Sequence, residues 1–359
     1  MKLSSLASKL KGRPARVLGL DVGSHSIKLV ELVESGGGLV LRRVGKALLP
    51  PGAIADGSIQ DRDEVMESLT ALLGNLQPKT RRAATSIAGY SVIVKRITVP
   101  YATEREIEDN LVAEAENYVP FEIEDVYVDF YILRSPGEGE KPESEIFLVA
   151  AKKEVVDDYA TVIQDVGLTP AVVDVDAFAM GNAFENAYGK VAEAVALVDI
   201  GASKTNLNVV AKGQSLFARD MAFGGRQLTE AIMEATGLDY PEAERLKISG
   251  TNDAALQSEA ASVCQRVCRA WGAEIRKAVD FFVANAQAEE KPTRILLSGG
   301  TALMQGLDRF LGQEAKLPVQ VFEPWRNISA EKGVDARYLA AVGPQMAIAT
   351  GLALRTADL

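Results

Sequence analysis

The first part of the chain changes from a strand-like to a helix-like spacing of apolar residues. Residues 17–49 contain three runs rich in valine and leucine, joined by glycine-containing turns, which predicts three β-strands. Residues 61–75 carry apolar residues at helical spacing behind Asp61, a candidate N-cap, and so predict a helix. Residues 82–99 return to strand character.

Thr103 and Glu106 form a capping-box pattern, which predicts that a polar, acid-rich helix begins there and covers residues 103–117. A polar Pro/Gly loop separates two strand-like runs farther along. The predicted elements are strands at 126–134 and 145–153, a helix at 154–166, and a segment at 170–189 that becomes helical near Ala177.

The opening pattern then recurs, because residues 196–225 again predict three strands with a D-x-G turn after the first. Alignment of the two hairpins matches Asp21 with Asp199, Gly23 with Gly201 and Lys28 with Asn206, and the two aspartates stand 178 positions apart. This period is too long for a solenoid, so it indicates two related domains. The remaining predicted elements are helices at 226–248 and 255–287, a strand, glycine turn and helix over 294–315, and a closing helix at 343–354.

Length and composition fit two globular domains: the chain has 359 residues, of which 47% are hydrophobic and 25% charged. A net charge of −10 argues against a nucleic-acid binder, which normally carries a basic surface. Without a run of 18 apolar residues, no membrane span is expected. Residues 1–16 are basic and mildly amphipathic but lack the apolar stretch of a signal peptide, so a solvated tail is expected, with a surface anchor as the alternative. The chain is therefore expected in the cytoplasm.

Histidine and cysteine are scarce, which limits the chemistry available. Cys264 and Cys268 are four residues apart in a helical pattern and match no zinc or thioredoxin spacing, so two buried thiols in a reducing cytosol are expected. His25 is the single histidine, which argues against a histidine-rich metal site or a Ser-His-Asp triad.

Three glycine turns follow apolar strands, at residues 21–26, 199–205 and 298–301. Glycine lets a backbone approach phosphate closely, and successive N–H groups form an anion-binding nest. Asp21 and Asp199 would repel phosphate directly, but they can hold a hydrated Mg²⁺ that bridges to it. The alternative, turns that bind nothing, stays open. The expected phosphate-binding residues are Asp21, Gly23, Ser24, His25, Ser26, Lys28, Asp199, Gly201, Ser203, Lys204, Thr205, Gly299, Gly300 and Thr301.

Residues 18–28, 197–208 and 295–307 resemble, in the same order, the phosphate-1, phosphate-2 and adenosine motifs of the actin/Hsp70/sugar-kinase superfamily. The resemblance implies an α/β, actin-like fold in which two ribonuclease-H-like domains enclose ATP or ADP with Mg²⁺. The stretches "AFGGRQLTEAI" and "YPEAERLKISG" resemble the FtsA/MreB branch. That likeness implies that Glu244 and Lys247 contact ribose or adenine, although both would also suit a solvated helix face.

Residues 116–133 and the later "TPAVVDVDAFAMGNAF" resemble the PilM family of type IV pilus assembly proteins. This resemblance implies a nucleotide-binding scaffold at the inner membrane, with a groove for the short cytoplasmic N-terminus of PilN. It also implies contacts with other pilus assembly proteins, and a homo-oligomer is possible. Tyr118, Pro120 and Phe121 are the sharpest marker; Tyr118 and Phe121 are candidate peptide contacts, or they only pack a helix end onto the sheet.

The resemblance divides the chain into two domains with insertions. The expected parts are a tail at 1–15, a first domain at 16–195 with an FtsA-like IC subdomain at about 86–168, a second domain at 196–340 with a helical insertion at about 226–290, and a C-terminal helix at 341–359 that packs on the first domain.

Two other functions are considered. An FtsA-like polymerising adaptor should carry an amphipathic C-terminal segment, which "GLALRTADL" does not resemble. A sugar-kinase-type phosphotransferase needs a general base, for which Asp174 and Asp176 are the candidates; either could instead position water or cap the following helix. At most a slow ATPase is expected.

Overall fold

Two β-sheets form the body of the molecule in the computed structural model, which describes residues 15–137 and 139–357. The first sheet has the strand order β11-β7-β2-β3-β4-β17 and the second the order β14-β13-β12-β15-β16. These strands are β2 (Leu18–Val22), β3 (Ser26–Ser35), β4 (Gly38–Leu48), β7 (Arg82–Ile87), β11 (Thr169–Val175), β12 (Ala194–Ile200), β13 (Thr205–Ala211), β14 (Gln214–Met221), β15 (Pro292–Ser298), β16 (Val319–Val321) and β17 (Ile328–Ala330).

The two sheets share one topology. In each, three consecutive strands pair antiparallel, and a later strand then adds parallel to the first of them: β7 to β2, and β15 to β12. A fifth strand extends each sheet in parallel, β11 beside β7 and β16 beside β15. The internal repeat predicted from the sequence is therefore confirmed as a repeat of topology.

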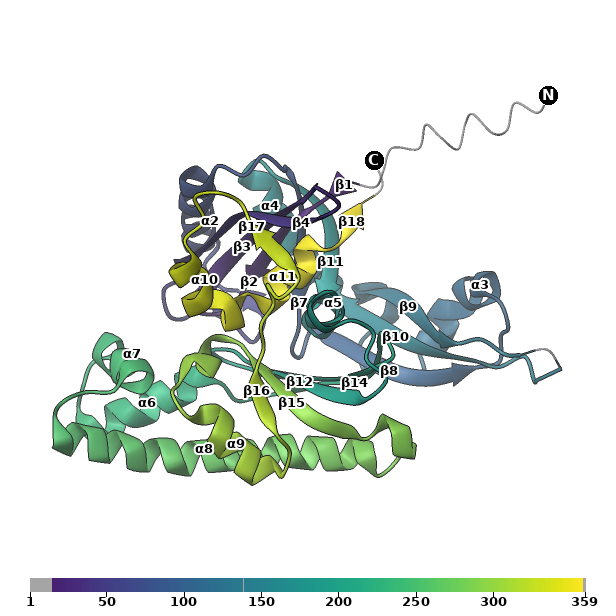
Figure 1. The fold of residues 1–359 in the computed structure, drawn as a ribbon. Helices are drawn as coiled ribbons and strands as arrows, with labels where there is room; N and C mark the ends of the chain where they lie inside the picture. The colour runs from purple at the N-terminus through teal and green to yellow at the C-terminus, as the bar shows by residue number, and fades with distance from the viewer. Residues whose placement is uncertain (1–14, 138, 358–359) are drawn as a thin grey trace.

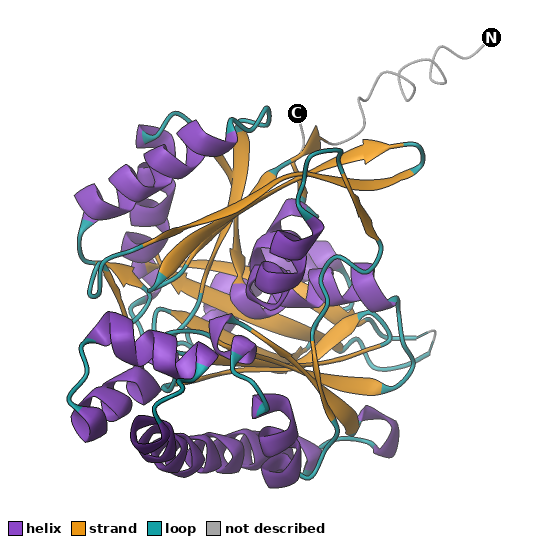
Figure 2. Cartoon of the chain, turned by 60° about the vertical axis from the view of Figure 1, so that its left-hand side comes forward, coloured by secondary structure: helices purple, strands orange, loops and turns teal. Residues whose placement is uncertain are grey.

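Helices cover the outer faces of both sheets and fill the space between them (Figure 2). The outer face of the first sheet packs on two helices and that of the second on four, whereas α5 and α11 lie between the sheets in a shared core. The helices are α2 (Arg62–Leu76) and α4 (Lys153–Asp165) on the first sheet, α6 (Gly225–Thr236), α7 (Tyr240–Ser249), α8 (Ala254–Val283) and α9 (Leu307–Ala315) on the second, and α5 (Asp176–Tyr188) and α11 (Ala347–Ala353) between them.

The predicted helices have the predicted buried faces. Asp61 caps α2 by accepting from Glu64 N, and Val65, Leu69, Leu72 and Leu73 are buried. In α8, which lies within the helix predicted at 255–287, apolar residues at helical spacing that include Trp271 and Ile275 are buried as well. Cys268 is buried, Cys264 is half-buried and both thiols are free. Within the described residues, no helix is both long and apolar enough to cross a membrane.

Two predicted helices differ from the structure. Residues 226–248 form α6 and α7 instead of one helix, because Gly237 adopts a left-handed conformation with φ of 72° and ends α6. The closing helix is shorter than predicted: a 3₁₀ turn (Gly343–Met346) precedes α11, and the chain then enters β18 (Thr356–Ala357), which pairs with β1 (Ala15–Arg16). Apart from Ala15, the expected tail at 1–15 lies outside the described residues.

An inserted subdomain projects from the side of the first domain (Figure 1). It is a separate three-stranded sheet in the order β8-β10-β9, built from β8 (Val92–Val99), β9 (Val126–Arg134) and β10 (Ser144–Lys152), and α3 (Glu104–Ala115) packs on it. Helix α4, inside the expected 86–168 insertion, packs instead in the core of the first domain.

The domain boundaries near the C-terminus also differ from the expected positions. Helices α6–α8 of the expected 226–290 insertion share one core with the second sheet. The chain returns to the first domain at β17, before residue 341, and α11 then contacts β2 and β3 of the first sheet.

Thr103→Ala is expected to destabilise the start of α3 by about 1 kcal/mol. Thr103 Oγ1 accepts from Glu106 N at 3.3 Å, and the Glu106 carboxylate accepts from Thr103 N at 3.0 Å, which confirms the predicted capping box. Faster amide hydrogen exchange over α3 would register the loss, with Thr103→Ser as the control that keeps the hydroxyl. Unchanged exchange in Thr103→Ala would contradict the assignment.

Candidate functional site

The turns after β2 and β12 have the same local geometry. Asp21 lies opposite Lys28 across one hairpin, and Asp199 lies opposite Asn206 across the other. In both turns the glycine N–H donates to a carbonyl three residues on: Gly23 N to Ser26 O at 3.2 Å, and Gly201 N to Lys204 O at 3.0 Å. The sequence repeat therefore places two equivalent turns, each with one aspartate, at the carboxyl ends of the parallel strands.

The two turns meet face to face. Ser24 Oγ lies 2.8 Å from Ser203 Oγ, so the turns are joined by a direct hydrogen bond. Arg226 spans both, because its Nη2 donates to Ser24 O at 2.9 Å and its backbone N–H donates to Ala202 O at 2.8 Å. The third glycine turn joins them through Thr301 Oγ1, which lies 3.2 Å from Gly201 O. Three segments far apart in sequence thus surround one cleft.

This cleft has a volume of about 300 Å³ and collects most of the residues predicted to bind nucleotide. Ser203 and Thr205 are the two predicted residues that do not line it; Thr205 is fully buried and donates to Phe223 O. The predicted residues that line the cleft are Asp21, Gly23, Ser24, His25, Ser26, Lys28, Asp199, Gly201, Lys204, Glu244, Lys247, Gly299, Gly300 and Thr301.

The two candidate general bases, Asp174 and Asp176, lie in different cavities. Asp176 lines the cleft, where Lys204 Nζ lies 3.0 Å from its carboxylate and Ser86 Oγ donates to it at 2.6 Å. Asp174 lies outside the cleft and forms an ion pair with Arg355 at 2.7 Å. Of the two, only Asp176 is placed to act on a ligand in the cleft.

Two glycines allow the segments to approach this closely. A Cβ on Gly225 would lie 2.5 Å from Thr301 Oγ1. Gly299 has φ of +90°, and a Cβ there would lie 2.3 Å from Ile200 O. Because neither position has room for a side chain, the glycines keep backbone exposed toward the cleft.

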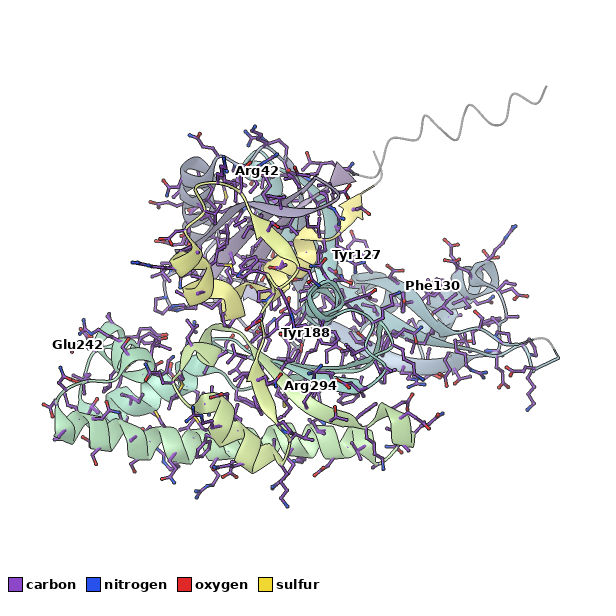
Figure 3. The ribbon with its side chains drawn as sticks, viewed as in Figure 1. Arg42, Tyr127, Phe130, Tyr188, Glu242 and Arg294 are labelled. Atoms are coloured by element: carbon purple, nitrogen blue, oxygen red, sulfur yellow. The ribbon has the colours of Figure 1, made fainter. Side chains whose placement is uncertain are left out.

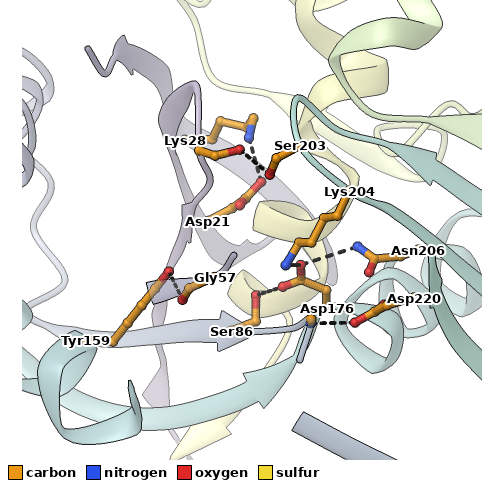
Figure 4. A network of polar contacts seen from close by, with 12 residues as sticks. Asp21, Lys28, Gly57, Ser86, Tyr159, Asp176, Ser203, Lys204, Asn206 and Asp220 are labelled. Carbon is orange, nitrogen blue, oxygen red and sulfur yellow. Dashed lines mark hydrogen bonds and ion pairs between the residues drawn. The ribbon is translucent and has the colours of Figure 1, made fainter. Parts of the chain in front are cut away.

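Three aspartates from three elements line the cleft: Asp21 on β2, Asp176 at the start of α5 and Asp199 on β12. Figure 4 labels Asp21 and Asp176. Lys28 Nζ lies 2.8 Å from the Asp21 carboxylate, and Ser298 Oγ donates to Asp199 at 2.8 Å. Burial raises the pKa of Asp199 to about 7, and the charges of Asp21 and Asp176 act in the same direction. Burial also raises the pKa of Asp21, although Lys28 opposes the shift.

Asp176 differs from the other two aspartates. Burial acts to raise its pKa, but the ion pair with Lys204 and the hydrogen bond from Ser86 outweigh burial, so the pKa lies below its usual value. The Lys204 cation therefore keeps Asp176 ionised. A general base works best with a pKa near the operating pH, so the lowered pKa makes Asp176 a poor general base.

Glu244 and Lys247, both on α7, form a second polar group in the lining of the cleft. Lys247 Nζ lies 2.7 Å from Glu244 Oε2 and donates to Thr229 Oγ1 at 2.9 Å and to Gly225 O at 3.1 Å. Burial lowers the pKa of Lys247, with Glu244 opposing. Both residues thus face the cleft instead of lying on a solvated helix face.

The cleft is more basic than the chain as a whole. Five cationic side chains and four carboxylates line it, whereas the net charge of the chain is −10. Arg226 Nε is buried without a hydrogen-bond partner among the described residues, so it remains available as a donor. Glycine-lined backbone, surplus cations and a free donor fit a phosphate-bearing ligand.

The polar lining residues that were not predicted include Lys46, Arg226, Tyr240 and Gln345. Arg226 directly follows the Gly224–Gly225 pair, a signal that could have identified it. The others come from β4, α7 and the turn before α11, and nothing in their local sequence marks them.

Mg²⁺ fits the same aspartates. In the described part of the chain, no group of three or more His, Cys, Asp or Glu forms a ready metal cage. Mg²⁺ usually binds through one or two carboxylates together with waters and substrate phosphates. Asp21 and Asp199 offer such a partial donor set. The negative charge of Asp21 raises the pKa of Asp199, and a cation between the two carboxylates would remove this repulsion.

A second cavity, of about 550 Å³, separates the inserted subdomain from α5 and β11. We call it the peptide-sized groove. The free edge of β9 borders it, because β9 pairs only with β10 in the described sheet. Tyr127, Asp129 and Tyr131 alternate along β9 and are exposed; Figure 3 labels Tyr127 and Phe130 on this strand. The groove thus combines apolar walls with an exposed Tyr-Asp-Tyr row.

The predicted peptide contacts Tyr118 and Phe121 do not line this groove. Both are half-buried against the core of the inserted subdomain, with Lys95 Nζ 5.8 Å from the ring centre of Tyr118 and Lys152 Nζ 4.7 Å from that of Phe121. These contacts agree with the alternative given above, in which the two side chains only pack a helix end onto the sheet.

Comparison with known proteins gives matches over nearly the whole chain. A family model described as "Type IV pilus assembly protein PilM" matches residues 19–357. The cell division protein FtsA of Bacillus subtilis is 23% identical over 91% of this chain and 82% of its own length. A solved "PilM-PilN type IV pilus biogenesis complex" contains a chain that is 28% identical, with a TM-score of 0.85 over 96% of this chain and 99% of that one.

The fold extends to more distant proteins. MreB 5 of Spiroplasma citri, solved bound to AMPPNP, is 13% identical with a TM-score of 0.52, and 95% of each chain is covered. These neighbours confirm the actin-like fold predicted from the three glycine turns.

Proposed function

The chain belongs to the PilM family of type IV pilus assembly proteins, and on that premise we propose that it is a nucleotide-binding adaptor. It holds ATP with Mg²⁺ in the cleft, and it captures the short cytoplasmic N-terminus of the inner-membrane protein PilN in the peptide-sized groove. This capture keeps the adaptor at the membrane surface. The observation that carries the proposal is the presence of two sites on either side of the β11–α5 junction. The lining of one suits a phosphate-bearing ligand, and the other is large enough for a peptide.

The cleft supports the nucleotide part. Asp21 and Asp199 would hold Mg²⁺ through water, and the turns at Gly23, Gly201 and Gly299 would surround the phosphates. When bound, Mg²⁺ would bridge phosphate oxygens and neutralise their charge. MreB 5, which shares the fold, was solved with AMPPNP bound.

The state of Asp176 supports nucleotide holding over rapid hydrolysis. Its ion pair with Lys204 and its lowered pKa leave it a weak acceptor for the proton of an attacking water. The cleft is then a site whose occupancy, more than its turnover, supports assembly.

The groove supports the peptide part. An extended peptide can add to the free edge of β9 through backbone hydrogen bonds and place alternate side chains against Tyr127 and Tyr131. Asp129 and Glu185 also line the groove and suit a peptide that carries basic residues. The solved relative is a complex of PilM with PilN.

A labelled synthetic peptide of the PilN N-terminus is expected to bind the purified chain with micromolar or better affinity in fluorescence polarisation. Tyr131→Ala should weaken binding about tenfold or more, because buried aromatic anchors dominate such interfaces. Tyr90→Ala is the matched control, since Tyr90 is 71% exposed and does not line the groove. Equal affinity in both variants would move the peptide site elsewhere, and absence of binding to the unaltered chain would refute the adaptor function.

A further inference from the structure

The first fourteen residues of the chain have the chemistry expected of a groove ligand. They carry Lys2, Lys9, Lys11 and Arg13, and the first acidic residue of the chain is Asp21. Leu3, Leu6 and Leu10 supply apolar anchors between these cations. In a chain with a net charge of −10, this is a concentrated basic segment.

This segment joins the fold next to the groove. Arg16 pairs with Thr356, and the residue before Thr356 is Arg355, which lines the groove and contacts Asp174 there. Arg16 Nη1 also donates to Leu354 O at 2.6 Å. The described chain begins at Ala15, which lies opposite Ala357 in this pairing, two residues beyond Arg355.

Length and charge both allow the segment to reach the groove. Fourteen residues span up to about 46–50 Å when extended. Three carboxylates line the groove: Asp129, Asp174 and Glu185. Arg355 is the only cation in that lining, and Asp174 already pairs with it. Glu185 pairs with Lys190 at 3.4 Å, so Asp129 is the lining carboxylate that has no ion pair among the described residues, and it can attract a basic segment.

We propose that residues 1–14 compete with the PilN peptide for this groove as a tethered, autoinhibitory ligand. The inference rests on the function proposed above for the groove. The tether matters because a ligand on the same chain has an effective concentration on the order of 1 mM. With an intrinsic dissociation constant of about 100 µM, the segment would raise the apparent dissociation constant of the PilN peptide about tenfold.

The test uses the full-length chain and the labelled PilN peptide in fluorescence polarisation. Two variants weaken the segment in different ways: Lys9→Glu/Lys11→Glu reverses its charge, and Leu6→Ser/Leu10→Ser removes apolar anchors. Both should bind the PilN peptide about tenfold more tightly than the unaltered chain. The serine variant matters because its net charge is unchanged, so a general electrostatic effect on the basic peptide cannot explain tighter binding. Lys277→Glu/Lys332→Glu, at exposed positions outside the groove lining, is the charge-matched control and should bind like the unaltered chain.

A second measurement asks whether the segment itself binds. A synthetic peptide of residues 1–14 should displace the labelled PilN peptide from the Leu6→Ser/Leu10→Ser variant. Equal affinities in the unaltered chain and both tail variants would overturn the inference while leaving the groove function intact. Failure of the PilN peptide to bind any variant would instead refute the groove function, and the inference with it. If charge reversal changes only binding to phosphatidylglycerol vesicles, the segment is a membrane contact and the competitor role is wrong.

Discussion

Replacing Asp21 by asparagine is expected to weaken binding of ATP in the presence of Mg²⁺ by about 10- to 100-fold, the loss of a charge-assisted interaction of about 1.5–3 kcal/mol. Asparagine has nearly the same shape and still offers an oxygen to Lys28, whose Nζ lies 2.8 Å from the Asp21 carboxylate. The charge that would hold a hydrated cation is gone. Isothermal titration calorimetry with MgATP, and with ATP in EDTA, measures the difference directly.

The expected pattern in this experiment has two parts. The unaltered chain should bind ATP more tightly with Mg²⁺ than with EDTA, whereas Asp21→Asn should bind with little difference between the two. Asp165→Asn is the matched control, because Asp165 pairs with Arg62 on the surface outside the cleft. If Asp21→Asn keeps full Mg²⁺-dependent affinity, Asp21 does not serve the cation and the proposed arrangement of the cleft is wrong.

The phosphate turns could be predicted from sequence because their geometry is local. A strand, an aspartate and a glycine within a few residues define each hairpin turn, and the same set recurs at Asp199 and Gly201. A single turn of this kind does not indicate a ligand site. The repeat does, because it places both turns at the same strand end of their respective sheets. The aligned residues Lys28 and Asn206 are, in the structure, the cross-strand partners of Asp21 and Asp199.

The sequence could not show that Asp174 and Asp176 face different cavities. On a continuous strand, residues two apart point to the same face. Here β11 ends at Val175 and α5 begins at Asp176, so the backbone changes direction between the two aspartates. One carboxylate then enters the cleft and the other the groove. A boundary error of one residue, ordinary in sequence-based prediction, is enough to hide this difference.

The peptide-sized groove could not be located from the sequence at all. Its walls come from β9, β11, α5 and the β13–β14 turn, which are brought together only by tertiary packing. Tyr118 and Phe121 stood out because they resemble a family pattern, but such a pattern does not separate packing from binding. Tyr127 and Tyr131 carry a visible alternation, but alternation alone does not say which face meets another domain.

Replacing Gly351 by alanine is expected to lower the free energy of unfolding by about 1–3 kcal/mol or more, the cost of overpacking a closed core. A Cβ on Gly351 would lie 1.6 Å from Ala179 O, so α11 and α5 touch through their backbones. The other side of α11 is equally close to the first sheet, since a Cβ on Gly19 would lie 2.1 Å from Ala349 O. No rotamer relieves a backbone contact, and therefore one helix must move.

Gly74→Ala is the matched control for this change, because it is also a helical glycine. Gly74 is exposed in α2, and a Cβ there would meet nothing within 4 Å, so alanine should stabilise the helix by up to about 1 kcal/mol. Urea unfolding measures both variants: the free energy of unfolding should fall in Gly351→Ala and rise in Gly74→Ala. Equal stabilities would show that α11 moves away from α5 at no cost. The observed packing leaves no room for that movement, because α11 is buried between both sheets and holds the two domains at the spacing that closes the cleft.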